Sequence, residues 1–173
     1  MTDIGILQFN CGKSNYKSTR PILDAVTPAK HLLLAIQEPG FNNYNRSTYC
    51  PKPYTLACAD DPTTKVCFMI DRNLDLGCWK FTSYTRYVAA LQLRLATEMI
   101  TIINVYNPPS TDPRITVWDA VNQALEEATG EIILLGDFNA HHPTWGGIQA
   151  AAEPKGEHLR REVAQLGLHL LTP

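Results

Sequence analysis

Residues 131–139 read EIILLGDFN, and the architecture of the chain can be worked out from this stretch. After Glu131 the sequence is an uninterrupted apolar run of strand length, which ends in Gly136, Asp137 and, after Phe138, Asn139. A short apolar run that stops at a polar, glycine-bearing turn is typical of a buried strand. The stretch therefore predicts an internal β-strand with polar side chains at its carboxyl end.

The same arrangement recurs along the chain. The apolar runs 4–9, 31–36 and 99–106 also end in polar residues. Strands that pair in a sheet bring their ends together on one rim, so we expect a single polar cluster. Its members would be Asn10, Glu38, Tyr106 with Asn107, and Asp137 with Asn139. Each residue alone has a plainer interpretation, because a carboxylate after a strand usually forms a turn and a tyrosine there fills a strand end.

The remaining segments predict a mixture of strands and helices without internal repeats. Stretches rich in β-branched and aromatic residues predict strands at 54–58, 65–70 and 87–95, and a last strand is expected at 168–171. Helices are expected over 18–29, from 112 to 130 and around 159–166. This order of elements predicts an α/β (α+β) fold, a layered sandwich with sheets inside and helices outside.

Composition narrows the class of protein. With 173 residues, of which 45% are hydrophobic and 18% charged, the chain fits one globular domain over residues 1–173. A net charge of −2 argues against a broad basic face for nucleic acid, so any such contact must be local. The five cysteines lack zinc-site spacing and are interpreted as reduced thiols, and no leader or membrane span is seen. These features predict an intracellular protein, nuclear or cytoplasmic, without a membrane partner.

The polar cluster contains the residue types that phosphodiester hydrolysis requires. That reaction needs neutralisation of the phosphate charge, an activated water and support for the leaving oxygen. Glu38 fits as a ligand of Mg²⁺, which takes oxygen donors and only one or two protein carboxylates. Asp137 could accept a proton from the attacking water while Asn139 fixes its position. The hydroxyl of Tyr106 could stabilise charge on the phosphate.

Four motifs resemble, in order, those of the endonuclease/exonuclease/phosphatase superfamily: QFNCG at 8–12, AIQEP at 35–39, NVYNPP at 104–109 and GDFNAHHPTWGG at 136–147. The last is the most specific and is similar to what non-LTR retrotransposon endonucleases carry. The resemblance implies a DNase I-like, four-layered α/β sandwich of two packed mixed sheets flanked by helices. It also implies that Asn10 and Glu38 belong to a Mg²⁺ site, with Mn²⁺ as the alternative metal. In the same way it places Tyr106 on the scissile phosphate and Asp137 and Asn139 on the nucleophile.

The resemblance also bears on the histidines and on the end of the chain. His141 and His142 are interpreted as loop structure or, with Asn107, as substrate contacts, and Trp145 as a packing anchor of the loop. The superfamily's catalytic histidine lies in a Ser-Asp-His motif near the domain's C-terminus, and no aspartate of this sequence is followed directly by histidine. The resemblance therefore implies a C-terminally truncated domain, monomeric unless its exposed sheet edges associate.

The leading hypothesis is a Mg²⁺-dependent DNA endonuclease that nicks target DNA for retrotransposition. The absent Ser-Asp-His motif leaves open a non-catalytic fragment of the same fold that binds nucleic acid or a partner. A further alternative is a phosphatase that acts on a phosphomonoester or a phospholipid, because the sequence contains no base-reading signature that excludes it.

Overall fold

A computed structural model describes residues 4–12, 16–42, 47–109, 116–146 and 151–171. The chain divides into two compact units, Met1–Asp137 and Phe138–Pro173. The first unit contains the strands β1 to β8 and the helices α1 and α2, and the second contains the helices α3 and α4. The single-domain organisation expected from the length stays a prediction.

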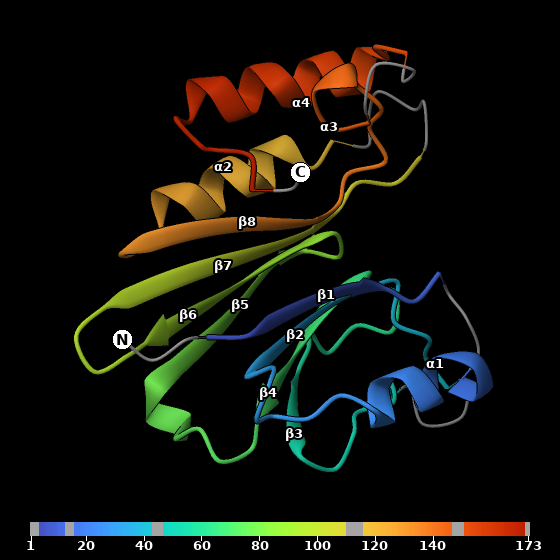
Figure 1. The fold of residues 1–173 in the computed structure, drawn as a ribbon, viewed down its shortest axis with the longest axis vertical. Helices are drawn as coiled ribbons and strands as arrows, with labels where there is room; N and C mark the ends of the chain where they lie inside the picture. The colour runs from blue at the N-terminus through green and yellow to red at the C-terminus, as the bar shows by residue number, and fades with distance from the viewer. Residues whose placement is uncertain (1–3, 13–15, 43–46, 110–115, 147–150, 172–173) are drawn as a thin grey trace. The chain divides into compact units, whose positions relative to one another are not determined.

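The first sheet follows from the N-terminal apolar runs. It consists of β1 (Ile6–Asn10), β2 (Leu33–Gln37), β4 (Val66–Asp71) and β3 (Tyr54–Ala57), in that spatial order. The pair β1 and β2 is parallel, because the helix α1 (Tyr16–Asp24) connects them as a crossover, and the other pairs are antiparallel. Figure 1 shows α1 beside this sheet, and Leu23 of α1 is buried in the cluster that joins them.

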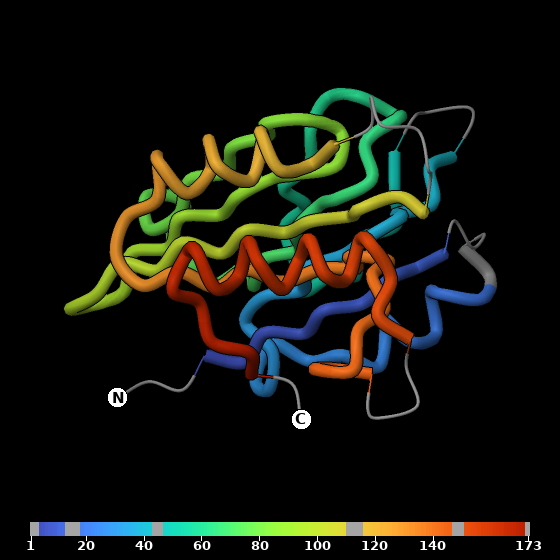
Figure 2. Tube along the Cα trace, turned by 90° about the horizontal axis from the view of Figure 1, so that it is seen from above, coloured from blue at the N-terminus to red at the C-terminus, as the bar shows by residue number. Residues whose placement is uncertain are grey.

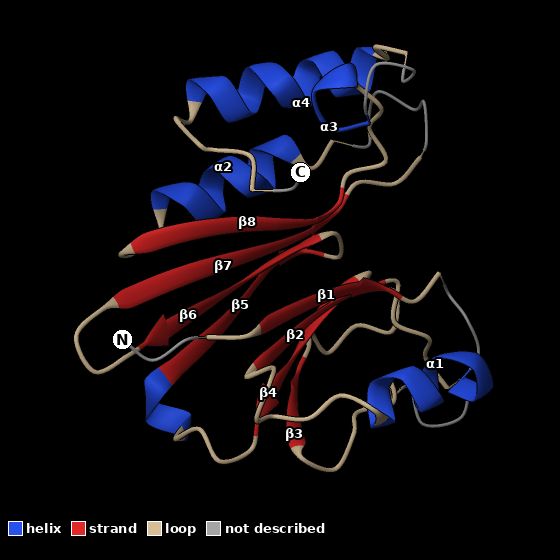
Figure 3. Ribbon diagram, viewed as in Figure 1, coloured by secondary structure: helices blue, strands red, loops and turns tan. Residues whose placement is uncertain are grey.

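The second sheet has the strand order β5 (Trp79–Thr85), β6 (Val88–Arg94), β7 (Met99–Tyr106) and β8 (Glu131–Asp137). A 3-10 turn, η1 (Leu76–Cys78), precedes it. Only β7 and β8 are parallel, and α2 (Trp118–Glu126) is their crossover. Figures 2 and 3 show α2 running along the strands of this sheet, and α2 contacts β5, β6 and β7. Both sheets are therefore mixed, and each carries one helix.

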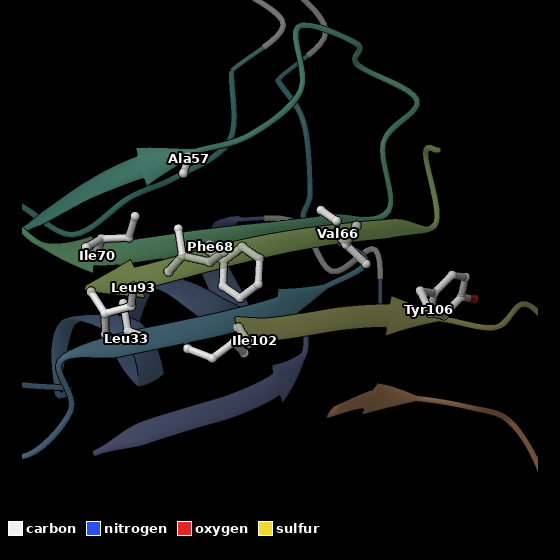
Figure 4. Close-up of a cluster of buried hydrophobic side chains, with 11 residues drawn as sticks. Leu33, Ala57, Val66, Phe68, Ile70, Leu93, Ile102 and Tyr106 are labelled. Carbon is white, nitrogen blue, oxygen red and sulfur yellow. The ribbon is translucent and has the colours of Figure 1, made fainter. Parts of the chain in front are cut away.

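The main core lies between the two sheets. Leu33, Phe68, Leu93 and Ile102 are fully buried there, and Figure 4 shows them side by side. Side chains alternate along β6, because Leu91 and Leu93 enter this core while Gln92 Nε2 donates to the carbonyl oxygen of Glu127 after α2. The layers α1, first sheet, second sheet and α2 confirm the predicted four-layered α/β sandwich.

Several predicted elements differ from the observed ones. The strand β5 was not predicted, because it is a polar edge strand in which only Trp79 and Phe81 pack against the core. The strand expected at 168–171 is wrong, since these residues are irregular and Leu171 is 87% exposed. An apolar run forms a strand only beside a partner, and none pairs with it in the described part of the chain. The helix expected over 18–29 covers Tyr16–Asp24, and the helix expected from 112 to 130 covers Trp118–Glu126, with 112–115 outside the described residues.

The cysteines behave as small apolar residues. All five are free thiols, and Cys11 and Cys67 are buried in the cluster between the first sheet and α1. Burial, together with the charge of Glu38, raises the pKa of Cys11 to about 11. Among the described residues, no helix combines the length and the apolar character needed to cross a bilayer.

Gly136 is the position in β8 where a side chain is least tolerable. Its φ is +145°, and a Cβ atom there would lie 1.9 Å from the carbonyl oxygen of Val105, its partner in β7. We expect Gly136→Ala to lower the free energy of unfolding by about 3 kcal/mol, because the ladder must open and the backbone is strained. Urea denaturation followed by tryptophan fluorescence measures this.

Gly167 provides the matched control for that substitution. It also has a positive φ, +64°, but no heavy atom of the described residues lies within 4 Å of the place that a Cβ atom would take. Gly167→Ala should therefore show only the conformational cost, about 1 kcal/mol. A Gly136→Ala variant as stable as Gly167→Ala would contradict the steric argument.

Candidate functional site

Five of the predicted site residues meet at one end of the two sheets. In the parallel pair β1 and β2, Asn10 lies opposite Gln37, so Glu38 follows directly at the strand end. In the parallel pair β7 and β8, Tyr106 lies opposite Asp137. Contacts of β1 and β2 with β7 and β8 bring these carboxyl ends together, and the resulting rim lies within the first compact unit.

Asn10 joins the two sheets at this rim. Its amide nitrogen Nδ2 donates a hydrogen bond of 2.5 Å to Asp137 Oδ2, while its Oδ1 accepts from the backbone N–H of Gly12 at 2.7 Å. Asp137 is also fixed through its backbone, because its carbonyl oxygen accepts from the N–H of Asn107 at 2.8 Å. The Asp137 carboxylate is thus held in place by residues from both sheets.

Tyr106 hydrogen-bonds one carboxylate of the rim, Glu38, and is influenced by the charge of the other, Asp137. Its hydroxyl donates to Glu38, which is only 8% exposed and whose backbone N–H donates to the carbonyl oxygen of Lys65. Burial raises the pKa of Tyr106, and the hydrogen bond to Glu38 and the negative charges of Glu38 and Asp137 raise it further. The hydroxyl therefore stays protonated and remains a donor. Figure 4 shows Tyr106 at one end of the core, with its hydroxyl pointing away from the apolar side chains.

The backbone of Glu38 is unusual for its residue type. Its φ is +47°, in the left-handed region that residues other than glycine rarely adopt. Such a conformation costs on the order of 1 kcal/mol and is typical of functional sites. This conformation turns the chain immediately after β2. The strand therefore ends there, and the Glu38 carboxylate lies at its end.

A layer of amide side chains separates the rim from the apolar core. Gln37 Nε2 donates to Asn104 Oδ1 at 2.6 Å, and Gln8 Nε2 donates to Gln37 Oε1 at 2.5 Å. Asn104 Nδ2 donates to the carbonyl oxygens of Ile36 and Cys67, at 3.1 and 3.0 Å. Asn104 and Gln37 are fully buried, so this network joins the second sheet to two strands of the first directly behind the rim.

The other predicted site residues, Asn139, His141 and His142, belong to the second compact unit. There they precede or lie in the loop around α3 (Pro143–Gly146), ahead of α4 (Pro154–Gln165). Asn139 has a φ of +44°, a conformation that asparagine tolerates better than most residues. How these residues contribute to a site stays a prediction.

Within that unit both histidines pair with acidic residues. His141 Nδ1 lies 3.2 Å from Glu153, and His142 Nε2 lies 3.2 Å from Glu157. His142 Nδ1 accepts from the N–H of Thr144, so Nε2 carries the proton that faces Glu157. The Trp145 indole packs against the His142 ring at 5.1 Å and donates to the carbonyl oxygen of Ala140, which agrees with its interpretation as a packing anchor.

Sequence reasoning identified the residues of the rim but not the residues that lie behind and beside them. The amide layer of Gln8, Gln37 and Asn104 was not predicted, and neither were Arg86 and Tyr87, which lie beside Tyr106. Two of these residues could have been found from the sequence, because side chains two positions apart in a strand lie on the same face. Gln8 stands two residues before Asn10, and Asn104 stands two residues before Tyr106. The sequence before β6 contained no comparable signal for Arg86.

The residues of the rim offer oxygen donors to a metal ion. Among the described residues no three His, Cys, Asp or Glu side chains gather into a metal-binding group. Mg²⁺ does not require such a group, since it is usually held by one or two carboxylates and keeps several waters. The Glu38 carboxylate and the Asn10 amide oxygen, at adjoining strand ends, are hard donors that fit this ion.

The architecture matches solved structures over almost the whole chain. The endonuclease domain of TRAS1, a telomere-specific non-LTR retrotransposon, is similar over 99% of this chain and 74% of its own, with a TM-score of 0.71 and 20% identity. The chain has a DNase I-like fold. The fold expected from the resemblance of the motifs is thereby confirmed. Residues 100–173 also match the family model described as endonuclease-reverse transcriptase.

Two further structures share this DNase I-like fold. A D. rerio TDP2 humanised by 14 mutations matches 97% of this chain and 68% of its own, with a TM-score of 0.59 and 14% identity. TDP2 from Caenorhabditis elegans matches 80% of this chain and 50% of its own, with a TM-score of 0.52 and 11% identity. No curated protein sequence matches the chain significantly.

Proposed function

We propose that this chain is a divalent-metal-dependent phosphodiesterase of the endonuclease type, with DNA as its substrate. The observation that carries the proposal is that strand ends of different sheets bring Glu38, Asn10, Tyr106 and Asp137 together on one rim, where Asn10 hydrogen-bonds Asp137. The choice of DNA is supported by the likeness to the TRAS1 endonuclease domain and by the match to the endonuclease-reverse transcriptase family. A role in retrotransposition and an intracellular location belong to the same proposal.

Asp137 and Tyr106 divide the chemistry between them. Asp137 accepts a proton from the attacking water, whose oxygen bonds to phosphorus while the bond to the leaving oxygen breaks. Asn10 keeps the accepting carboxylate in position through its 2.5 Å hydrogen bond. Tyr106, protonated because its pKa is raised, turns its single O–H from Glu38 to a non-bridging phosphate oxygen when the substrate binds. The leaving oxygen takes its proton from bulk water.

Glu38 and Asn10 are the residues that would hold Mg²⁺, or Mn²⁺ in its place. When bound, the cation would neutralise charge on the phosphate and on the leaving oxygen. Before the substrate binds, Glu38 accepts the Tyr106 hydrogen bond, so the residue proposed to hold the metal keeps the phosphate-binding hydroxyl at the rim.

Plasmid nicking tests the proposal. We expect this chain to convert supercoiled plasmid to the open-circular form with Mg²⁺ or Mn²⁺ and to stop when EDTA is added. Parallel incubations with a phosphomonoester and a phospholipid distinguish an endonuclease from a phosphatase. No nicking by this chain at any metal concentration would contradict the proposal and favour a non-catalytic protein of this fold.

Removing the Tyr106 hydroxyl should slow the chemical step. We expect Tyr106→Phe to lower kcat for nicking by roughly 100-fold, because one donor to the developing charge is lost. The raised pKa of Tyr106 keeps the hydroxyl protonated in the wild type, so the ratio of wild-type to variant rates should stay constant between about pH 7 and pH 9.

Tyr84 offers a matched control for this prediction. Its hydroxyl also bonds a glutamate, Glu127 at 2.9 Å, but Glu127 follows α2, away from the rim. Tyr84→Phe should therefore nick at the wild-type rate. Equal rates for Tyr106→Phe and Tyr84→Phe would remove Tyr106 from the proposed chemistry.

A further inference from the structure

A cationic and aromatic pair lies beside Tyr106. Arg86 and Tyr87 form the connection between β5 and β6. The guanidinium carbon of Arg86 is 4.8 Å from the centroid of the Tyr87 ring, and that ring is 6.3 Å from the Tyr106 ring at an interplanar angle of 37°. One aromatic ring therefore separates an exposed guanidinium from the hydroxyl that contacts Glu38.

Backbone hydrogen bonds fix this connection to the rim. The N–H of Tyr106 donates to the carbonyl oxygen of Tyr87 at 2.9 Å. The N–H of Lys65 and the hydroxyl of Thr64 donate to the carbonyl oxygen of Arg86, and Lys65 in turn accepts from the N–H of Glu38. Arg86 and Tyr87 are thus anchored to the same segments that position Glu38 and Tyr106.

The charge of Arg86 is available to a ligand. Arg86 helps to lower the pKa of Asp61, but the Asp61 carboxylate already accepts from the N–H and the hydroxyl of Thr63. In the described part of the chain no ion pair joins Arg86 to a carboxylate. A guanidinium stacked on a ring is preorganised, and its planar fork matches the oxygens of a phosphate.

An acidic rim needs such a cation. Glu38 and Asp137 repel the phosphates that flank a scissile bond, and the chain as a whole carries a net charge of −2. We propose that Arg86, seated on Tyr87, binds a backbone phosphate next to the scissile phosphate, with Tyr87 as the positioning residue. The proposal deepens the endonuclease function and rests on it. It assigns the substrate as a nucleic-acid strand that extends beyond the cleaved bond.

Fluorescence anisotropy of a labelled DNA duplex tests the assignment without requiring cleavage. The duplex is titrated with this chain and its variants in Ca²⁺, over a series of salt concentrations. We expect Arg86→Ala to weaken binding by about 10-fold at low salt and to reduce the slope of log K against log salt by about 0.9, the value for one phosphate contact. Arg86→Lys should retain the slope and lose about 3-fold in affinity, since lysine keeps the charge but lacks the planar fork.

Arg94 is the matched control, because it is an exposed arginine at the far end of β6, the strand that follows Arg86 and Tyr87. Its Nη2 donates to the carbonyl oxygen of Gly77 at 3.2 Å, far along the strand from Tyr106. Arg94→Ala should reproduce the wild-type affinity and salt slope. If Arg86→Ala and Arg94→Ala change the slope equally, or if the unsubstituted chain does not bind the duplex, the assignment is overturned.

The two proposals fail in distinguishable ways. If the chain binds the duplex with a salt slope that depends on Arg86 but does not nick DNA, the endonuclease function is contradicted and the phosphate contact of Arg86 is supported. If the wild type nicks DNA and Arg86→Ala leaves the slope of log K against log salt unchanged, only the phosphate contact is contradicted.

Discussion

Replacing Asp137 by asparagine should lower the nicking rate by roughly 10³- to 10⁴-fold, at the upper end of what a general base contributes. The neutral amide cannot take a proton from water at neutral pH. The substitution keeps the shape of the side chain, and its oxygen can still accept the hydrogen bond from Asn10 Nδ2. The fold should therefore persist, and the loss should appear in kcat with little change in KM.

The measurement compares nicking rates with circular dichroism and urea unfolding of the same preparations. Asp119→Asn is the matched control, because Asp119 is an exposed aspartate in the first turn of α2 that has no part in the proposed chemistry. It should nick at the wild-type rate. If Asp137→Asn keeps more than about a tenth of the activity, a loss smaller than any expected of a general base, Asp137 is not the base.

Replacing Asn104 by alanine should lower the free energy of unfolding by about 4 kcal/mol, the largest loss of stability expected here. The variant loses the hydrogen bonds to Gln37, Ile36 and Cys67 in a site that is 0% exposed. Each buried polar group left without its partner costs about 1–3 kcal/mol, and the cavity adds to this. Because these bonds join the two sheets, the rim should loosen and nicking should fall with stability.

Asn73→Ala provides the reference for this effect, since Asn73 is exposed in the turn after β4. That change should stay within about 0.5 kcal/mol of the wild type. Urea denaturation followed by tryptophan fluorescence measures both variants. An Asn104→Ala chain within about 1 kcal/mol of Asn73→Ala would mean that water replaces the lost partners and that the amide layer does not hold the sheets together.

Asn10 and Asn104 show which polar residues of the site can be predicted from the sequence and which cannot. Asn10 was predicted at the rim because it ends an apolar run, and a change from apolar to polar residues is visible in one dimension. Asn104 lies inside an apolar run, where its polarity appeared only as an interruption. Its meaning depends on Gln37 and on carbonyl oxygens of β2 and β4, distant in sequence.

The sequence by itself determined the buried strands, the polar residues at their ends and, through the motifs, the DNase I-like fold. These follow from hydrophobic periodicity and turn chemistry, which act between neighbours along the chain. Tertiary structure alone decided that Asn10 bonds Asp137, that Tyr106 contacts Glu38, and that Tyr87, which carries Arg86 on its ring, packs against Tyr106. The physical reason is that these contacts depend on how the two sheets stack and on which strands lie at the edges of each sheet. Both are set by packing between residues up to 127 positions apart in the chain.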